Sequence, residues 1–343
     1  MSVVTVDCGT TNTRVRVWRN NTVVAQACEP VGVRDTARTG SHATLAAGVR
    51  HALTQAMAQA GNDLTGDCLI VASGMITSDA GLCPLPHLCA PVSLADLAQA
   101  TVVQDMPYIT PHPVWFIPGV KNALADISAD NIGMMDVMRG EEVETFGLLA
   151  LHSISGPAVI ILPGSHTKFV RIDCEQRITA CATSMTGELL DLLTRQSLLA
   201  ASLESRFTRS PDTGYLLKGA QASRESGFAR ACFSVRLLDL FTDATHDQKA
   251  GWLLGATLST DIQTLKNSPA LAMTPDTRLV ICGKPPLAQA LATLIDADPF
   301  FTVAPLLIAE DAQTPLSGVG AMAVLRHIPA LTDALCRATG DAL

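Results

Sequence analysis

A chain of 343 residues with 48% hydrophobic and 16% charged side chains is long for one core, so its composition favours a two-domain α/β enzyme. The formal net charge of −8 argues against a nucleic-acid partner, because Lys and Arg are too few to neutralise a phosphate backbone. Ten cysteines stand singly without zinc spacing, and no signal-peptide pattern precedes the first predicted strand, so we expect a reducing, cytoplasmic location. The nearly uncharged stretches at 80–95 and 146–170 contain proline and glycine, so we expect no membrane-spanning helix.

The first predicted unit is a β-hairpin over residues 3–18, in which an apolar strand, a Gly-plus-hydroxyl turn and an alternating strand follow one another. A glycine lets the backbone come close to a ligand, while hydroxyls and exposed amides supply donors to an anion. Asp7 ends the first strand, and one carboxylate is enough to hold a hydrated magnesium ion between phosphates. The turn residues that we assign to phosphate binding are Gly9, Thr10, Thr11 and Asn12.

A βββαβ order is predicted for the first half of the chain. We expect a third strand over residues 22–26, a loop through residue 41, a helix over 42–60 and a buried strand over 68–72. The buried strand ends in a polar turn, a common place for ligand donors in α/β folds, made of Ser73, Gly74 and Met75.

Acidic residues gather where a loop-rich section over residues 77–136 ends and a helix over 141–152, opened by Gly140, is predicted to begin. The acids in question are Asp136, Glu141 and Glu142. An acid in the first turn of a helix is favoured by the helix dipole alone, so this position leaves a purely structural role open.

Residues 158–173 repeat the first hairpin at a distance of 155 positions. Gly164 corresponds to Gly9, whereas Leu162 stands where the first copy has Asp7. Two such hairpins could grip opposite sides of a polyphosphate, and the alternative is two ordinary hairpins with turn residues. The residues of this copy that we assign to phosphate binding are Gly164, Ser165, His166 and Lys168, the last two because of their positive charge.

After the second hairpin, the second half is predicted to follow the same order of strands and helices as the first half. We expect a third strand over 176–181, an apolar helix over 186–201 with Thr186 as its N-cap, mostly helix over 220–265, and a buried strand over 278–282. Pro285 and Pro286 are predicted in the first turn of the helix that follows. The segment GVGAMA at 318–323 matches a dinucleotide pattern, but no strand leads into it, so we predict close helix packing there.

Two βββαβα halves with phosphate hairpins at equivalent places resemble the actin-like ATPase and sugar-kinase superfamily. The resemblance implies an α/β fold of two actin-like (ribonuclease H-like) domains, each a mixed βββαβα sheet with helices, and a nucleotide cleft between them. It implies domains at residues 1–140 and 141–318, with the segment from about 319 to 343 packing back on the first. It also implies ATP and Mg2+ as cofactors, Asp7 near the metal, and a general base at Glu141, with Glu142 and Asp136 as substitutes.

Six strings in this order resemble the 2-dehydro-3-deoxygalactonokinase family: DCGTTN at 7–12, SGM at 73–75, IPGV at 117–120, VMRGEE at 137–142, LPGSHTK at 162–168 and MTGEL at 185–189. The resemblance implies transfer of the ATP γ-phosphate to the 6-hydroxyl of 2-dehydro-3-deoxy-D-galactonate and, on family expectation alone, a homodimer. Because that substrate is a 2-oxo acid, its carboxylate needs donors. The residues that we assign to the substrate are Arg139 first, then Arg14 and Lys168, with Ser73, Gly74 and Met75.

Two departures from the family pattern concern the nucleotide. The adenosine region after the 278–282 strand reads Gly283-Lys284 followed by two prolines, where a small Gly/Ser/Thr turn is expected, so nucleotide preference stays open. Thr257 stands where an acid is expected. The alternative functions are a kinase of another 2-oxo-3-deoxy or aldonic sugar acid and a non-enzymatic actin-like nucleotide-binding sensor.

Overall fold

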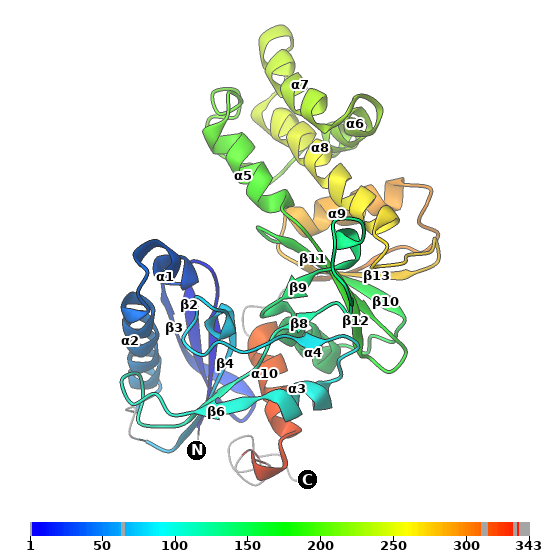
Figure 1. Cartoon of the computed structure of the whole chain (residues 1–343). Helices are drawn as coiled ribbons and strands as arrows, with labels where there is room; N and C mark the ends of the chain where they lie inside the picture. The colour runs from blue at the N-terminus through cyan, green and yellow to red at the C-terminus, as the bar shows by residue number, and fades with distance from the viewer. Residues whose placement is uncertain (1, 63–65, 310–314, 332–334, 336–343) are drawn as a thin grey trace.

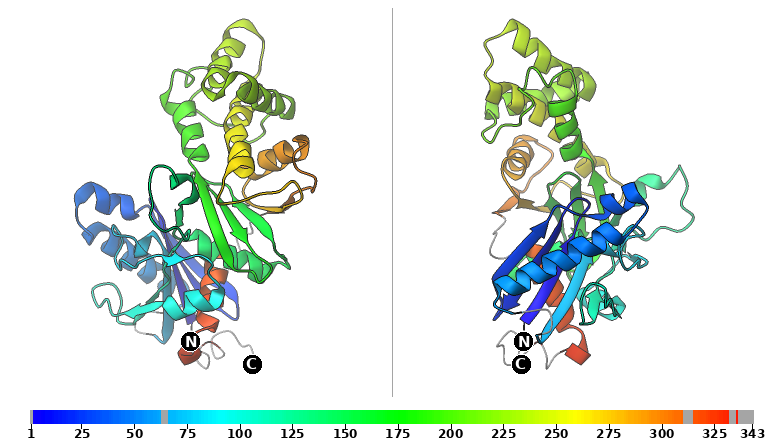
Figure 2. Two further views of the ribbon diagram at one scale, coloured as in Figure 1. Left: turned by 45° about the vertical axis from the view of Figure 1, so that its right-hand side comes forward. Right: turned by 90° about the vertical axis from the view of Figure 1, so that its left-hand side faces the viewer.

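The chain folds into two lobes, each built around a mixed β-sheet, in a computed structural model that describes residues 2–62, 66–309, 315–331 and 335 (Figure 1). The N-terminal hairpin and helices α1 and α2 form one side of the molecule. Helices α5 to α8, within residues 186–267, rise away from this side of the molecule (Figure 2). No helix in the described part of the chain is long and apolar enough to cross a membrane.

The first sheet has six strands in the order β3-β2-β1-β4-β7-β6. β1 pairs antiparallel with β2 and parallel with β4, as a hairpin followed by a helical crossover requires. The elements are β1 Ser2–Cys8, β2 Thr13–Arg19, β3 Thr22–Glu29, α1 Val33–Thr39, α2 Ala43–Gln59, β4 Cys68–Gly74, β6 Val102–Gln104 and β7 Val114–Phe116. The helix-period residues of α2 are buried against this sheet, namely Leu45, Val49, Leu53, Ala56 and Met57.

The second sheet repeats the first with five strands in the order β12-β11-β10-β13-β14. β10 pairs antiparallel with β11 and parallel with β13, just as β1 pairs with β2 and β4. The strands are β10 Ala158–Leu162, β11 Thr167–Ile172, β12 Ile178–Ser184, β13 Arg278–Gly283 and β14 Leu306–Ala309. The predicted repeat of the βββαβα unit is therefore confirmed in the arrangement of both sheets.

The segment predicted as loop-rich contains short elements between the two sheets. They are the 3-10 helix Met75–Thr77, α3 Leu94–Ala100, the 3-10 helix Ile132–Met134, and a three-stranded sheet of β5 Leu88–Cys89, β8 Val120–Lys121 and β9 Val137–Met138. The remaining helices of the second half are α5 Thr186–Gln196, α6 Thr213–Ser226, α7 Phe228–Phe241, α8 His246–Asn267 and α9 Leu287–Ala297.

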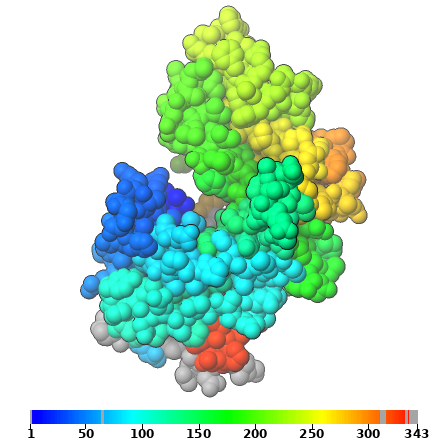
Figure 3. All heavy atoms as spheres, in the orientation of Figure 1, coloured from blue at the N-terminus to red at the C-terminus, as the bar shows by residue number. Residues whose placement is uncertain are grey.

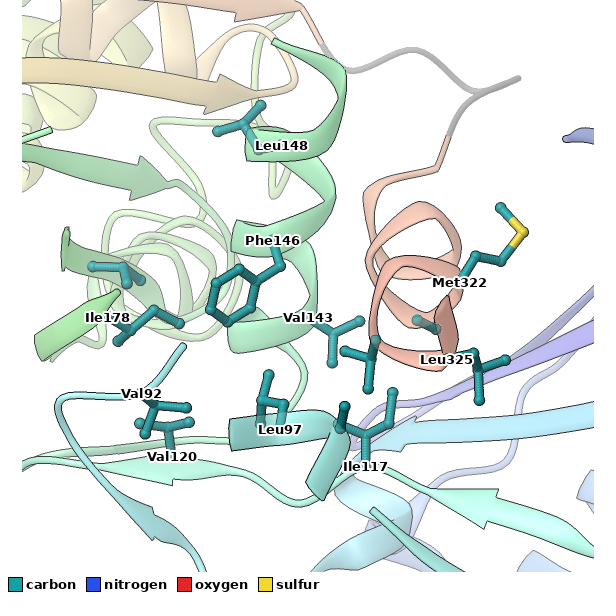
Figure 4. Packing of buried hydrophobic residues seen from close by; sticks show 14 of the residues in the cluster. Val92, Leu97, Ile117, Val120, Val143, Phe146, Leu148, Ile178, Met322 and Leu325 are labelled. Carbon is teal, nitrogen blue, oxygen red and sulfur yellow. The ribbon is translucent and has the colours of Figure 1, made fainter. Parts of the chain in front are cut away.

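Helices α4 (Glu141–Leu151) and α10 (Leu316–Arg326) join the two lobes through one hydrophobic cluster (Figure 4). Val143 of α4 faces α10 and Leu325, whereas Phe146 points to the other side of α4, toward Ile178 (Figure 4). The same cluster includes residues of both sheets. A Cβ at Gly320 would lie 2.8 Å from the carbonyl carbon of Val143, so the small residues of α10 allow close helix packing as predicted. α10 also contacts β1, which brings the C-terminal helix back to the first sheet.

Three local predictions were wrong. Pro285 and Pro286 do not stand in the first turn of α9, because this helix begins at Leu287 and Pro286 is its N-cap. Residues 33–39 form helix α1 instead of a loop, because the Asp35 carboxylate accepts the Gly32 N–H at 3.1 Å and caps the first turn. Thr186 is the first residue of α5 and not its N-cap, which is Met185; the Thr186 hydroxyl donates to buried Asp261 instead.

Candidate active site

Three adjoining cavities share lining residues and form one cleft. The middle and inner cavities are lined by residues of both lobes, and Figure 3 shows the surface hollowed between the lobes. The outer cavity (440 Å³) lies between α5 and residues 284–287, and it shares Gly164, Ser165 and Lys284 with the middle cavity (380 Å³). The inner cavity (700 Å³) shares five residues with the middle one, which are Asp7, Arg14, Glu141, Glu144 and His166. Residues from both halves of the repeat therefore meet in the middle cavity.

The start of α1 holds the first phosphate turn in place. The N–H of Val33 donates to the Gly9 carbonyl at 3.3 Å, and the N–H of Arg34 donates to the Thr10 carbonyl at 3.0 Å. Gly9 and Thr10 line the inner cavity. Two predicted phosphate ligands of this turn, Thr11 and Asn12, hydrogen-bond each other at 2.8 Å and are not among the described residues that line the three cavities.

The start of α5 holds the second phosphate turn in the same way. The N–H of Glu188 donates to the Ser165 carbonyl at 2.8 Å, and a Cβ at Gly187 would overlap the Gly164 carbonyl oxygen. His166 lies 2.9 Å from a carboxylate oxygen of Glu188 and lines the middle and inner cavities. The sequence analysis missed the two supporting glycines, Gly32 and Gly187, although they are also 155 residues apart.

Asp7 lies at the junction of the middle and inner cavities. Its Oδ2 is 3.7 Å from a guanidinium nitrogen of Arg14 and accepts the Ser317 hydroxyl at 3.4 Å. Among the described residues, no group of three or more His, Cys, Asp or Glu side chains could hold a metal by itself. A lone carboxylate beside a phosphate cavity fits Mg2+, which keeps several waters and takes its other ligands from substrate phosphates.

The two acids at the start of α4 face different surroundings. Glu141 lines the middle and inner cavities, and its Oε2 accepts the N–H of Arg139 at 3.2 Å. Burial raises the pKa of Glu141, while the positive charge of Lys168 opposes this shift. Glu142 is fully buried, and both of its oxygens accept the N–H of Gly140, at 2.9 and 2.8 Å.

Glu142 has no contact with the cleft in the described part of the chain, because it is absent from the lining of all three cavities. Burial and the charge of Glu141 raise the pKa of Glu142 to about 8. Of the three cavities, Asp136 lines only the inner one, and its Oδ1 accepts the Thr183 hydroxyl at 2.9 Å. Of the three predicted acids, Glu141 is thus the one shared by the phosphate side and the inner cavity.

Lys168 lies in the inner cavity, away from the phosphate turn to which we assigned it. Its Nζ donates to the Val137 carbonyl and to the Thr183 hydroxyl, both at 2.6 Å, and lies 3.9 Å from Asp136 Oδ1. These contacts position its charge in the inner cavity, which Glu141 also lines.

Arg139 lines the inner cavity and is held by the loop after β4. Its guanidinium donates to the Thr77 hydroxyl at 2.9 Å and to the Leu85 carbonyl at 2.6 Å. Of the polar turn at the end of β4, Met75 lines this cavity, whereas Ser73 is buried. Gly74 lies beside Asp7, since a Cβ there would be 3.6 Å from Asp7 Oδ1.

Sequence reasoning missed several residues that line the inner cavity, namely Ser78, Asp79, His87 and Glu144. Only Glu144 had a usable signal, since it follows Glu141 by three positions and therefore shares its helix face. The other three come from a segment with no regular period.

The predicted adenosine region lies at the junction of the middle and outer cavities. Gly283 lines the middle cavity and Lys284 lines both. The outer cavity also has a mainly apolar wall that includes Leu190, Phe207, Pro286 and Leu287. Thr257 is buried inside α8, where its hydroxyl donates to the Leu253 carbonyl at 2.7 Å, so this departure from the family pattern lies away from the cleft.

Residues 7–308 match the family model described as 2-keto-3-deoxy-galactonokinase. The chain belongs to this family. It is 30% identical over 201 residues to the 2-dehydro-3-deoxygalactonokinase of Escherichia coli, covering 58% of this chain and 61% of that protein. Family membership confirms the predicted enzyme class, a carbohydrate kinase, and does not favour the sensor alternative.

Solved structures confirm the predicted fold. A Sinorhizobium meliloti structure assigned as a 2-dehydro-3-deoxygalactonokinase has a TM-score of 0.72 at 22% identity, covering 95% of this chain and 99% of that one. The activator of 2-hydroxyisocaproyl-CoA dehydratase from Clostridium difficile, solved with bound ADPNP, has a TM-score of 0.52 at 12% identity, with 100% of both chains covered. The domain boundary at 140/141 and the roles of the site residues stay predictions.

Proposed function

We propose that this kinase transfers the γ-phosphate of ATP to the 6-hydroxyl of 2-dehydro-3-deoxy-D-galactonate and releases ADP and the 6-phosphate. The observation that carries the proposal is that Asp7 and Glu141 line both the middle and the inner cavity. One carboxylate for a metal and one for a proton are thus available where a phosphate cavity opens into a cavity with room for a sugar acid.

We assign the adenosine to the outer cavity, because its apolar wall of Leu190, Phe207 and Pro286 suits a flat ring. We assign the phosphates to the middle cavity, where the turn of Gly164 and Ser165 exposes backbone and hydroxyl donors. In this assignment the chain of phosphates runs from Lys284 toward Asp7, so the γ-phosphate ends beside the inner cavity.

Asp7 would hold Mg2+ together with waters and phosphate oxygens. When bound, the ion would neutralise negative charge that develops on the phosphate oxygens. Arg14, 3.7 Å from Asp7, adds a fixed positive charge to the same wall of the cleft.

Glu141 is our proposed general base. As the sugar O6 attacks the γ-phosphorus, the O6 proton passes to the Glu141 carboxylate, and the bond from phosphorus to the β–γ bridging oxygen breaks with its electron pair leaving on ADP. Burial raises the pKa of Glu141 above its ordinary value, which makes the carboxylate a better proton acceptor than an exposed glutamate. Arg139 is our proposed partner of the substrate carboxylate, since a guanidinium can bind a carboxylate through two hydrogen bonds.

ADP release from Mg-ATP with a panel of 2-oxo-3-deoxy sugar acids and aldonates tests this proposal. We expect the galactonate-derived acid to be preferred over its gluconate epimer, and Glu141→Gln to lower kcat by at least about a hundred-fold. The matched control is Glu225→Gln, because Glu225 is exposed and hydrogen-bonds only Gln221 among the described contacts of its carboxylate. Equal activity of the two variants would refute the base, and preference for another acid would keep the chemistry but change the substrate.

The cytoplasmic location and the homodimer are further parts of this proposal that rest on the sequence and on family expectation. Cell fractionation tests the first, and light scattering of the purified protein tests the second.

A further inference from the structure

Three separate sequence segments meet on one wall of the inner cavity. Gly119 comes from the IPGV string, Arg139 from the VMRGEE string, and His87 from the loop before β5. A Cβ at Gly119 would lie 2.6 Å from Arg139 Cγ and 3.0 Å from His87 Cδ2, and it would overlap the Met138 carbonyl. Only glycine at this position therefore lets the arginine and the histidine lie together.

The contact between Arg139 and His87 fixes which nitrogen of the histidine carries the proton. Arg139 Nη2 lies 3.4 Å from His87 Nδ1. A guanidinium is only a donor, so Nδ1 is the acceptor and the neutral ring carries its proton on Nε2. Burial, with the charges of Arg139 and Lys121, lowers the pKa of His87 to about 4, so the ring stays neutral at pH 7.

The guanidinium of Arg139 is itself fixed by Thr77 and the Leu85 carbonyl, at 2.9 and 2.6 Å. Its backbone N–H donates to Glu141 Oε2 at 3.2 Å. The acidic group on this wall is Asp79, which lines the same cavity. Its negative charge acts to raise the pKa of both Arg139 and His87, and so offsets part of the lowering that burial causes.

We propose that the pair of Arg139 and His87, seated against Gly119, binds the carboxylate and the 2-oxo oxygen of the substrate, and that His87 determines the preference for 2-oxo over 2-hydroxy acids. The carboxylate and the neighbouring oxo group offer only acceptors, which match a guanidinium and a neutral ring N–H. The oxygen of a 2-hydroxy group can accept the same N–H, but its own O–H then finds no acceptor in this pair, and the acidic group on the wall is Asp79. This inference rests on the proposed function, because it takes the inner cavity as the sugar-acid site.

The test compares the wild-type enzyme with His87→Leu, His87→Gln and Gly119→Ala. KM and kcat are measured for 2-dehydro-3-deoxygalactonate and for galactonate, and binding of each acid is measured by calorimetry. We expect His87→Leu to weaken binding of the 2-oxo acid roughly ten-fold, the effect of one lost hydrogen bond to a charged or polarised group. Galactonate binding and the KM for ATP should change less than about two-fold, while His87→Gln, which keeps an N–H donor, recovers part of the loss.

His51→Gln is the matched control, because this exposed histidine pairs with Glu29 and is not among the described residues that line the three cavities. Equal loss of affinity for both acids, or no loss in any variant, would overturn the inference. If the wild type binds the 2-oxo acid but transfers no phosphate, the proposed function fails while the His87 comparison by calorimetry still decides the inference. If His87→Leu does not fold, the smaller loss that we expect of His87→Gln for the 2-oxo acid, with galactonate binding unchanged, carries the comparison.

Discussion

Replacing Gly187 with alanine tests whether helix α5 holds the second phosphate turn in position. The new Cβ would overlap the Gly164 carbonyl oxygen and lie 2.9 Å from Ser165 Cα. Both neighbours are backbone, so the turn or the helix start must shift instead of a flexible side chain. We expect the hydrogen bond from Glu188 N–H to the Ser165 carbonyl, 2.8 Å long, to be strained or lost.

The expected change in the free energy of unfolding is the difference between two opposing effects. Overpacking costs about 1–3 kcal/mol, while alanine gains about 1 kcal/mol over glycine inside a helix. Tm should therefore fall by only a few degrees, since about 1 kcal/mol corresponds to roughly 2–4 °C in a protein of this size class. The displaced turn should raise the KM for ATP about ten-fold, equivalent to about 1.4 kcal/mol. The KM for the sugar acid should stay within about two-fold, because Gly164 and Ser165 do not line the inner cavity as described.

Initial-rate kinetics with each substrate varied, together with thermal melts, measure this split. Gly133→Ala is the matched control, since a Cβ there meets no heavy atom within 4 Å. Gly32→Ala is the companion variant at the first turn, where a Cβ would lie 2.6 Å from the Gly9 carbonyl oxygen. If Gly187→Ala and Gly133→Ala give the same KM for ATP, the reasoning that α5 sets the phosphate turn is refuted.

Three further predictions concern buried acids. Because burial raises the pKa of Glu141 and the base must be ionised, kcat should fall on the acid side above pH 4.5, and Lys168→Met should move this fall to still higher pH in a pH–rate profile. Glu142 is neutral in the fold below its raised pKa of about 8, so its stabilising contribution is lost as pH rises from 4.5 through 8. The Tm of Glu142→Gln should therefore rise relative to the wild-type Tm as pH increases across that range. A Tm difference between the two proteins that does not change with pH would contradict this. Thr186→Val removes a hydroxyl donor from buried Asp261 and should cost about 1–3 kcal/mol, seen as a lower Tm, whereas Thr186→Ser should not.

Both hairpins could be predicted because their signals are local. In each copy the glycine and hydroxyl residues of the turn stand between strands of apolar or alternating pattern, so the strand and turn assignments need only neighbours in sequence. The order of strands in the second sheet then followed from the repeat. Helix α1 was missed because it is short and buries only Val33 and Thr36, which leaves little periodic pattern to read.

The choice between Glu141 and Glu142 could not be made from the sequence. Both acids stand in the first turn of α4, so propensity and the helix dipole treat them alike. Successive helix residues point about 100° apart, and only the packing of α4 between the lobes decides that Glu142 is fully buried while Glu141 reaches the cleft. The wall of the outer cavity was missed for a similar reason, since Phe207 and Leu190 come from separate segments and look like ordinary core residues.

The repeat also separates what the two halves share from what each contributes alone. The shared features are structural, since both turns have a glycine at matching positions and a helix start that holds them, with Gly32 and Gly187 again 155 residues apart. Asp7 has no acidic counterpart, because the second copy has Leu162, and Glu141 lies on the helix that joins the lobes, outside both hairpins. Two equivalent turns could grip a polyphosphate from both sides, but the metal that we propose at Asp7 and the base that we propose at Glu141 would break that symmetry. The positions at which the copies differ are therefore where the chemistry of this cleft is to be tested first.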